Sequence, residues 1–127
     1  MDILIESTKN FEKDLDGLSS DEKAIAVEKI NQCTEQFSTH KADVYHALHR
    51  HALAPELNGY ESSLYILEVS PELSAILSVD EDPIFGQVIF TLFRVVQRGD
   101  LDKAYQDVAE SLYRDIFQRD RQIAQIS

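Results

Sequence analysis

"LYILEVSPELSAILSVD", residues 64–80, decides the fold, because apolar and polar side chains alternate along it on both sides of a Ser-Pro-Glu turn. One face of the first segment carries Tyr65, Leu67 and Val69, and the second segment continues with the same period of two. Alternation around a short turn predicts two antiparallel strands that form a hairpin. Every charged side chain in the stretch is a carboxylate, Glu68 among them. The stretch therefore predicts a sheet with an acidic surface.

The next segment, "IFGQVIFTLFRVV" at residues 84–96, is apolar on both faces for most of its length. This pattern predicts a central strand that is covered on both sides of the sheet. The aromatic side chains of Phe85, Phe90 and Phe93 leave apolar surface, which a partner or a second copy of the chain could cover.

Two amphipathic helices are predicted before the hairpin. Residues 7–18 carry apolar side chains at spacings of four and three, with Ser7 or Thr8 as the N-cap. The second helix begins at Ser19, three residues before Glu22, which is the spacing of a capping box. Its apolar face consists of Ala26, Ile30, Cys33 and Phe37. Because each helix has one apolar stripe to bury, we expect a helical hairpin packed on the sheet.

Residues 41–58 are predicted to form a partly helical connector, in which His46, His49 and His51 cluster. These three histidines are the candidate ligands if a metal ion binds. No zinc-protease signature accompanies them, so we expect no metal ion. The alternative is a polar connector whose charge changes at about pH 6.5.

A further helix closes the fold. Its apolar side chains recur at helical spacing at Leu101, Tyr105, Val108, Leu112 and Ile116. Such a helix can cover the side of the sheet that the helical hairpin leaves open. The polar tail at residues 118–127 is expected to fray. The order of elements predicts a single α+β domain over residues 1–127.

Composition limits the class of protein. A chain of 127 residues with 43% hydrophobic and 28% charged side chains fits one globular domain. No apolar run reaches the roughly 20 residues of a membrane-spanning helix, and Asp2 and Glu6 do not fit a secretion signal. We expect a cytoplasmic protein that does not contact a membrane. Cys33 is the single cysteine and is expected to be a buried thiol, and we expect no cofactor.

The net charge of −11 is unevenly distributed along the chain. Residues 1–50 hold ten acids and six Lys or Arg, residues 51–93 hold seven acids and no Lys or Arg, and residues 94–127 hold six of each. Nucleic-acid binders gain affinity by neutralising phosphates with Lys and Arg. The middle of the chain is not able to do so, and its acids could equally serve solubility alone.

Two pieces of the sequence resemble the RelE/ParE superfamily of bacterial toxins. "GYESSLYILEV" followed by "SAILSV" is similar to that family's paired strands, and "VIFTLFRVVQRGDLDKAY" is similar to its strand-to-helix end. The resemblance covers residues 3–116. It implies a RelE/ParE-like microdomain with an N-terminal helical hairpin packed on a small, mainly antiparallel sheet and a C-terminal helix. Members either cut mRNA on the ribosome or poison DNA gyrase, and an antitoxin peptide holds them inactive.

The resemblance also implies that the RNA-cleaving site is degenerate. Members that cleave RNA present arginines from the second and third strands of the sheet, where they hold phosphates and stabilise charge. The corresponding positions here are Glu68 and Ser74. A carboxylate repels a phosphate, and a hydroxyl offers a hydrogen bond without charge.

Two candidate catalytic residues do match the family, Arg98 at the end of the third core strand and Tyr105 in the last helix. Arg94 competes with Arg98 for the family's basic position. Tyr105 also lies on the apolar stripe of its helix, so it could be a packed tyrosine. Arg98 could pair with a nearby aspartate such as Asp100.

Three hypotheses follow from these residues. The first is an active toxin endoribonuclease, an mRNA interferase that acts on mRNA with the ribosome and inhibits translation. The second is a non-catalytic module bound by an antitoxin-like peptide or another protein. The third is a toxin that acts by binding a cellular protein target. We favour a toxin-type protein that binds a protein partner over an active enzyme, because likeness of fold does not confer a site. A homo-oligomer is also possible.

Overall fold

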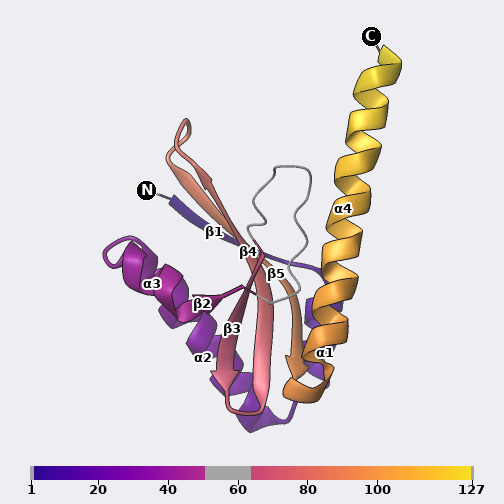
Figure 1. Cartoon of the computed structure of the whole chain (residues 1–127). Coiled ribbons are helices and arrows are strands. Elements are labelled where there is room, and N and C mark those ends of the chain that lie inside the picture. Colours follow the sequence, from indigo (N-terminus) through magenta and orange to yellow (C-terminus); the bar gives the residue numbers. More distant parts are fainter. Residues whose placement is uncertain (1, 51–63, 127) are drawn as a thin grey trace.

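The computed structural model describes residues 2–50 and 64–126 and shows a mixed α+β fold, which confirms the predicted class (Figure 1). The elements in chain order are β1 (Asp2–Ser7), α1 (Lys9–Asp16), α2 (Ser20–Phe37), α3 (Lys41–Ala47), β2 (Leu48–His49), β3 (Leu64–Ser70), β4 (Leu73–Asp82), β5 (Gln87–Gln97), the short 3-10 helix η1 (Arg98–Asp100) and α4 (Leu101–Ile126).

The strands form one sheet in the order β1-β5-β4-β3-β2. β1 runs parallel to β5, and the other neighbours are antiparallel. The predicted hairpin is confirmed as β3 and β4, in which Glu68 lies opposite Ser74. The sheet is therefore mixed, with one parallel pair of strands and three antiparallel pairs.

Strand β1 is a correction to the sequence analysis, which assigned no strand to the N-terminus. β1 pairs with β5, and Ile3 lies beside Val88. The only local signal is the short run Ile3-Leu4-Ile5, because the other side chains of β1 are polar and exposed. Its strand character depends on a partner more than eighty residues away, and reasoning on a local window does not see such a pairing.

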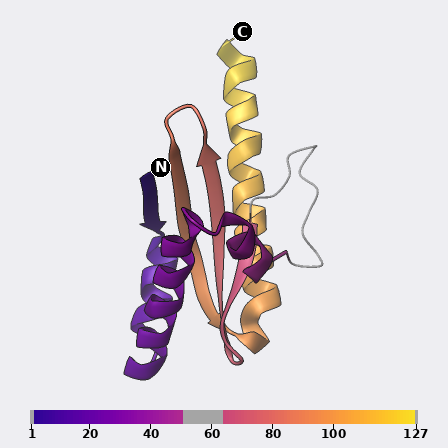
Figure 2. The ribbon, with the colours of Figure 1, turned by 90° about the vertical axis from the view of Figure 1, so that its left-hand side faces the viewer.

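Apolar side chains form a cluster on each face of the sheet. Figure 2 shows the helices on either side of the strands. On one face, α1, α2 and α3 cover the larger cluster, which includes Phe11, Ile30, Phe37, Val44, Leu77 and Phe90. On the other face, α4 covers a smaller cluster of Leu64, Ile66, Ile76, Val96, Ala104, Tyr105, Val108 and Ala109. Helices therefore lie on both faces of the sheet, with α1, α2 and α3 on one face and α4 on the other.

The face of β5 that carries Val88, Phe90 and Leu92 is buried. The opposite face is half-buried up to Phe93 and buried at Val96, so the predicted burial on both faces is found only at the end of the strand. Phe90 and Leu92 belong to the larger cluster, whereas Val96 belongs to the smaller one. The strand begins at Gln87 rather than at residue 84. Phe85 instead lies in an exposed turn between β4 and β5, so the exposed aromatic surface that we expected exists at Phe85 and not at Phe90.

Capping fixes where the first two helices begin. The Thr8 hydroxyl accepts a hydrogen bond from the Phe11 N–H (3.1 Å), so Thr8 rather than Ser7 is the N-cap of α1. The predicted capping box of Ser19 and Glu22 is present in α2. These side chains satisfy backbone N–H groups that have no partner within the helix.

The connector is helical at α3, as expected, and then forms the short strand β2, which the sequence analysis did not predict. Residues 51–58 of that connector, His51 and the expected strand start at residues 60–63 lie outside the described residues. The backbone of α4 is helical to Ile126, and fraying of residues 118–127 stays a prediction. In the described part of the chain, no helix combines the length and the apolar character needed to cross a bilayer.

Candidate functional site

The two degenerate positions of the sheet differ in their exposure. Glu68 in β3 is exposed, whereas Ser74 in β4 is only 7% exposed. Alternation places Ser74 on the same face as Ile76, which packs in the cluster under α4. Position 74 is therefore not part of an open surface, and a long cationic side chain there would be buried.

Arg98 is exposed in η1, directly after β5. Its backbone N–H donates to the Glu72 carbonyl (2.9 Å), which holds η1 beside the turn between β3 and β4. The structure thus brings Arg98 to the same end of the sheet as Glu68 and Ser74. Arg98 is a cation that solvent and a partner can reach.

Tyr105 is buried, with 2% of its surface exposed, and packs in the cluster between α4 and the sheet. Its neighbours in that cluster include Ile76 and Val96. The structure places its ring inside the protein rather than on the surface with Arg98. The position fits the packed tyrosine that its place on the apolar stripe indicated.

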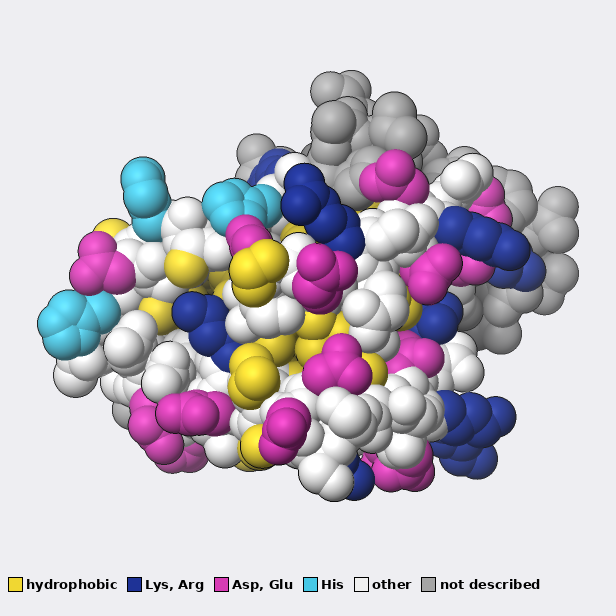
Figure 3. Space-filling model, turned by 90° about the horizontal axis from the view of Figure 1, so that it is seen from below, with side chains coloured by type: hydrophobic (Ala, Val, Ile, Leu, Met, Phe, Trp, Pro, Cys, Tyr) yellow, Lys and Arg dark blue, Asp and Glu magenta, His cyan; other side chains and the backbone are white. Residues whose placement is uncertain are grey.

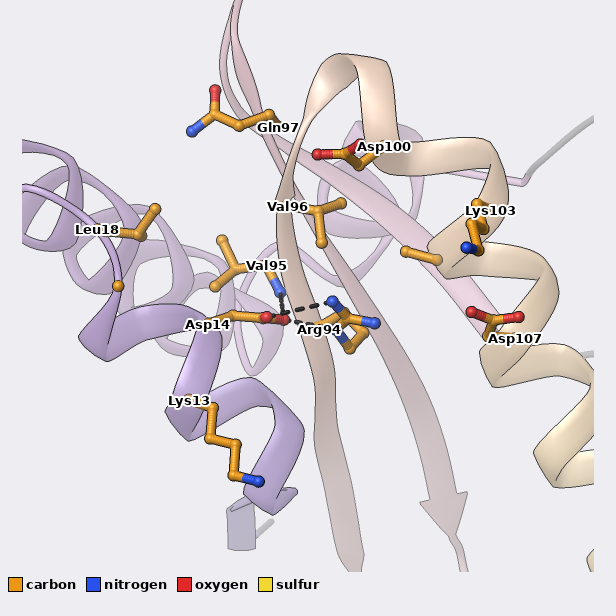
Figure 4. Close-up of a pocket in the computed structure, with 12 residues that line it drawn as sticks. Lys13, Asp14, Leu18, Arg94, Val95, Val96, Gln97, Asp100, Lys103 and Asp107 are labelled. Atoms are coloured by element: carbon orange, nitrogen blue, oxygen red, sulfur yellow. Dashed lines mark hydrogen bonds and ion pairs between the residues drawn. The ribbon is translucent and has the colours of Figure 1, made fainter.

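Arg94, the competitor for the basic position, is held by Asp14 of α1 (Figure 4). The Arg94 Nε donates to Asp14 Oδ2 (2.6 Å) and Nη2 donates to Oδ1 (3.2 Å). Both side chains are mostly buried, with 28% and 18% exposed. These hydrogen bonds raise the pKa of Arg94 against the opposing effect of burial, so its charge is fixed. The Arg94 side chain therefore has a structural role in joining β5 to α1.

Asp14 also closes the edge of β5. β1 ends with Ser7 beside Leu92, so the last residues of β5 have no described strand on that side. There the Thr8 hydroxyl donates to the Phe93 carbonyl (2.9 Å), and Asp14 Oδ2 accepts from the Val95 N–H (3.2 Å). We call this stretch the capped edge of β5. The sequence analysis missed Asp14, because its role depends on contacts across eighty residues of chain.

A groove of about 570 Å³ runs between α1 and α4, with the end of β5 as its floor (Figure 4). Its charged lining residues are Lys13, Asp14, Arg94, Asp100, Lys103 and Asp107. Cations and carboxylates are thus present in equal number. Arg94 and Asp107 also line a second hollow of about 280 Å³, which Thr8 and Leu112 border as well. A groove with balanced charge lacks the excess of cations that phosphate binding needs.

The face of the molecule in Figure 3 carries both acidic and basic side chains. On the face in Figure 3, acidic side chains are spread among exposed apolar ones. The Lys and Arg side chains on this view stand apart and do not merge into one surface. This face therefore shows no continuous basic patch.

His46 and His49 are exposed on α3 and β2. Within residues 2–50 and 64–126, no group of three His, Cys, Asp or Glu side chains is arranged to hold a metal ion. His51, the remaining candidate ligand, lies outside these ranges. The expectation that no metal ion binds stays a prediction.

A polar cluster ties α3 to β4. The Tyr45 hydroxyl donates to Glu81 Oε2 (2.9 Å), and Lys41 forms an ion pair with Glu81 Oε1. Burial, with a smaller effect of Glu81, raises the pKa of Tyr45. The hydrogen bond from Lys41 lowers the pKa of Glu81. These groups hold each other, so we assign the cluster to stability rather than to chemistry.

Comparison of the chain with protein families, with curated proteins and with solved structures gave no match.

Proposed function

We propose that the protein is a RelE/ParE-like toxin-type protein that acts by binding a protein partner, either an antitoxin-like peptide or a cellular target, and that RNA cleavage has largely been lost. The resemblance of the hairpin and of the strand-to-helix segment supports the family. The partner-binding mode is supported by the charges around the candidate site.

The observation that carries the proposal is the state of the residues that would cleave RNA. Glu68 presents a carboxylate where the family has an arginine, and Tyr105 is buried. Arg94 is neutralised by Asp14, which leaves Arg98 as the exposed cation among the predicted site residues. One flexible cation does not provide the preorganised charge stabilisation that phosphoryl chemistry uses. A protein target requires no such arrangement.

Induced expression with growth recording, together with an mRNA-cleavage assay on the purified protein with and without ribosomes, tests this proposal. We expect growth arrest without RNA cleavage, unchanged in Arg98→Ala. Arg114→Ala, an exposed arginine on α4, is the matched control. RNA cleavage that disappears in Arg98→Ala and persists in Arg114→Ala would overturn the proposal and establish the endoribonuclease. Absence of both arrest and cleavage would exclude a toxic cellular target and leave the antitoxin-like peptide.

A further inference from the structure

β1 is an edge strand of the sheet, with β5 on one side and no described strand on the other (Figure 2). Five of its six side chains are exposed; Ile3 alone is partly buried, against the larger core cluster. An open strand edge presents backbone groups that can pair with another strand. The outer edge of β1 is therefore a possible binding surface.

Two hydrogen bonds fix which backbone groups point outward. The Asp2 N–H donates to the Gly86 carbonyl (2.9 Å), and the Thr8 N–H donates to the Leu92 carbonyl (3.0 Å). At both ends of β1, the even-numbered residues thus direct their backbone groups toward β5. Because these groups alternate along a strand, the N–H and C=O groups of Ile3 and Ile5 point away from the sheet.

The side chains along this edge carry a definite pattern. Leu4 and Ile5 are large apolar residues with 43% and 47% of their surface exposed. Alternation places Leu4 between Asp2 and Glu6 on the face opposite to Ile3. One face of this edge thus carries an acidic, an apolar and an acidic side chain in order.

This pattern disfavours a second copy of the chain as the occupant. In the antiparallel register where Ile3 and Ile5 exchange hydrogen bonds with those of a copy, Leu4 faces Leu4. Asp2 then lies directly opposite Glu6 at both ends of the paired segment. Like charges directly opposite destabilise a strand pair. The net charge of −11 adds repulsion between copies and attraction for a basic partner.

We propose that β1 binds, by strand addition, an extended segment of a partner protein that carries a Lys or Arg on each side of an apolar residue, at alternate positions. The apolar residue lies opposite Leu4, and the two cations lie opposite Asp2 and Glu6. Backbone groups of Ile3 and Ile5 supply the hydrogen bonds, as in other cases of strand addition. The inference rests on the proposed function, because it names the surface and the chemistry of the protein partner.

An exposed turn extends this surface at the start of β1. The bond from Asp2 to Gly86 holds the turn between β4 and β5 beside the strand. Asp82 Oδ1 accepts from the Ile84 N–H (3.0 Å) and the Phe85 N–H (3.3 Å), which orders the turn. The Phe85 side chain nevertheless remains 73% exposed. A bound segment longer than β1 would gain apolar contact there.

Fluorescence anisotropy with the full chain and a labelled peptide, Ser-Lys-Thr-Val-Thr-Lys-Ser, tests the inference. The control peptide has Glu in place of both Lys. We expect the Lys peptide to bind at least about tenfold more tightly than the Glu peptide, and the difference to shrink with added salt.

Ile5→Pro removes an outward N–H without removing a bond to β5, as proline permits on an edge strand. We expect it to weaken binding of the Lys peptide by at least about tenfold. Leu4→Lys is a second variant, which keeps the backbone but places a cation between the two lysines of the bound peptide. Its matched control is Val27→Lys on α2, where the wild-type residue is 42% exposed. Circular dichroism checks that each variant is folded.

Loss of binding in Ile5→Pro and Leu4→Lys, with retention in Val27→Lys, would support strand addition at β1. Binding that is equal in all variants, or absent in the wild type, would overturn it. A dimer that Ile5→Pro dissociates would overturn it in favour of a second copy. Growth arrest without RNA cleavage in Ile5→Pro would sink this inference and leave the proposed function intact. RNA cleavage by a protein that still binds the peptide at β1 would overturn the proposed function and leave the inference about β1 intact.

Discussion

The capped edge of β5 and the outer edge of β1 lie in the same sheet, but they differ in whether side chains of the protein bond their backbone groups. At the edge of β5, the Thr8 hydroxyl donates to the Phe93 carbonyl, and the Asp14 carboxylate accepts from the Val95 N–H. At the outer edge of β1, the backbone N–H and C=O groups of Ile3 and Ile5 point away from the sheet, and the side chains of Leu4 and Ile5 are exposed. The contrast shows that this fold can close an edge with two polar side chains. Among the described strands, β1 is therefore an edge at which another chain could pair.

The largest expected effect comes from opening the capped edge. Asp14→Ala leaves the mostly buried Arg94 guanidinium and the Val95 N–H without this acceptor, and should cost about 2–4 kcal/mol of unfolding free energy. Urea denaturation measures the change. Asp16→Ala on the same helix is the control, since its pair with Lys23 (3.6 Å) is exposed and worth about 0–1 kcal/mol. Equal losses in both variants would mean that Asp14 does not close the edge.

A smaller effect is expected at the other capping residue. The Thr8 hydroxyl both accepts from the Phe11 N–H and donates to the Phe93 carbonyl. Thr8→Val removes both bonds and should lower the unfolding free energy by about 1–2 kcal/mol. Thr8→Ser keeps the hydroxyl and should retain most of the stability in the same urea titration. If Thr8→Ser loses as much as Thr8→Val, the methyl group rather than the cap is what matters.

The smallest effect concerns the cluster of Lys41 and Glu81, whose hydrogen bond and ion pair involve no residue of either edge. Because Lys41 lowers the pKa of Glu81, the ionised carboxylate stabilises the fold above the ordinary carboxyl range. This contribution is lost as the pH falls through the lowered pKa. We expect the urea midpoint to fall less in Lys41→Met than in the wild type between pH 7 and about pH 3. An identical fall in both proteins would rule out the pair as a source of acid sensitivity.

Local patterns predicted much of the fold. The capping box at Ser19 and the alternation of β3 and β4 depend on residues that are near one another in the chain. The helices α1, α2 and α4 follow from the same short-range spacing. The prediction failed where an element needs a distant partner, as β1 needs β5 and β2 needs β3.

The sequence predicted which residues belong to the candidate site, but not how exposed each side chain is or what it pairs with. The sequence marked Glu68, Arg94, Arg98 and Tyr105, yet the exposure of each follows from what packs on it. α4 covers Tyr105, and Asp14 holds Arg94. Nothing in the spacing of Asp14 along α1 indicates which cation it meets, because that contact is made across the sheet edge.

The sequence by itself determined the α+β class, the hairpin, the apolar character of β5 and the acidic middle of the chain, because periodicity and composition are local properties. Only the tertiary structure decided that Arg94 is neutralised, that Ser74 is buried and that β1 joins the sheet as an open edge. These outcomes depend on contacts between residues far apart in sequence, which exist only once the chain has folded.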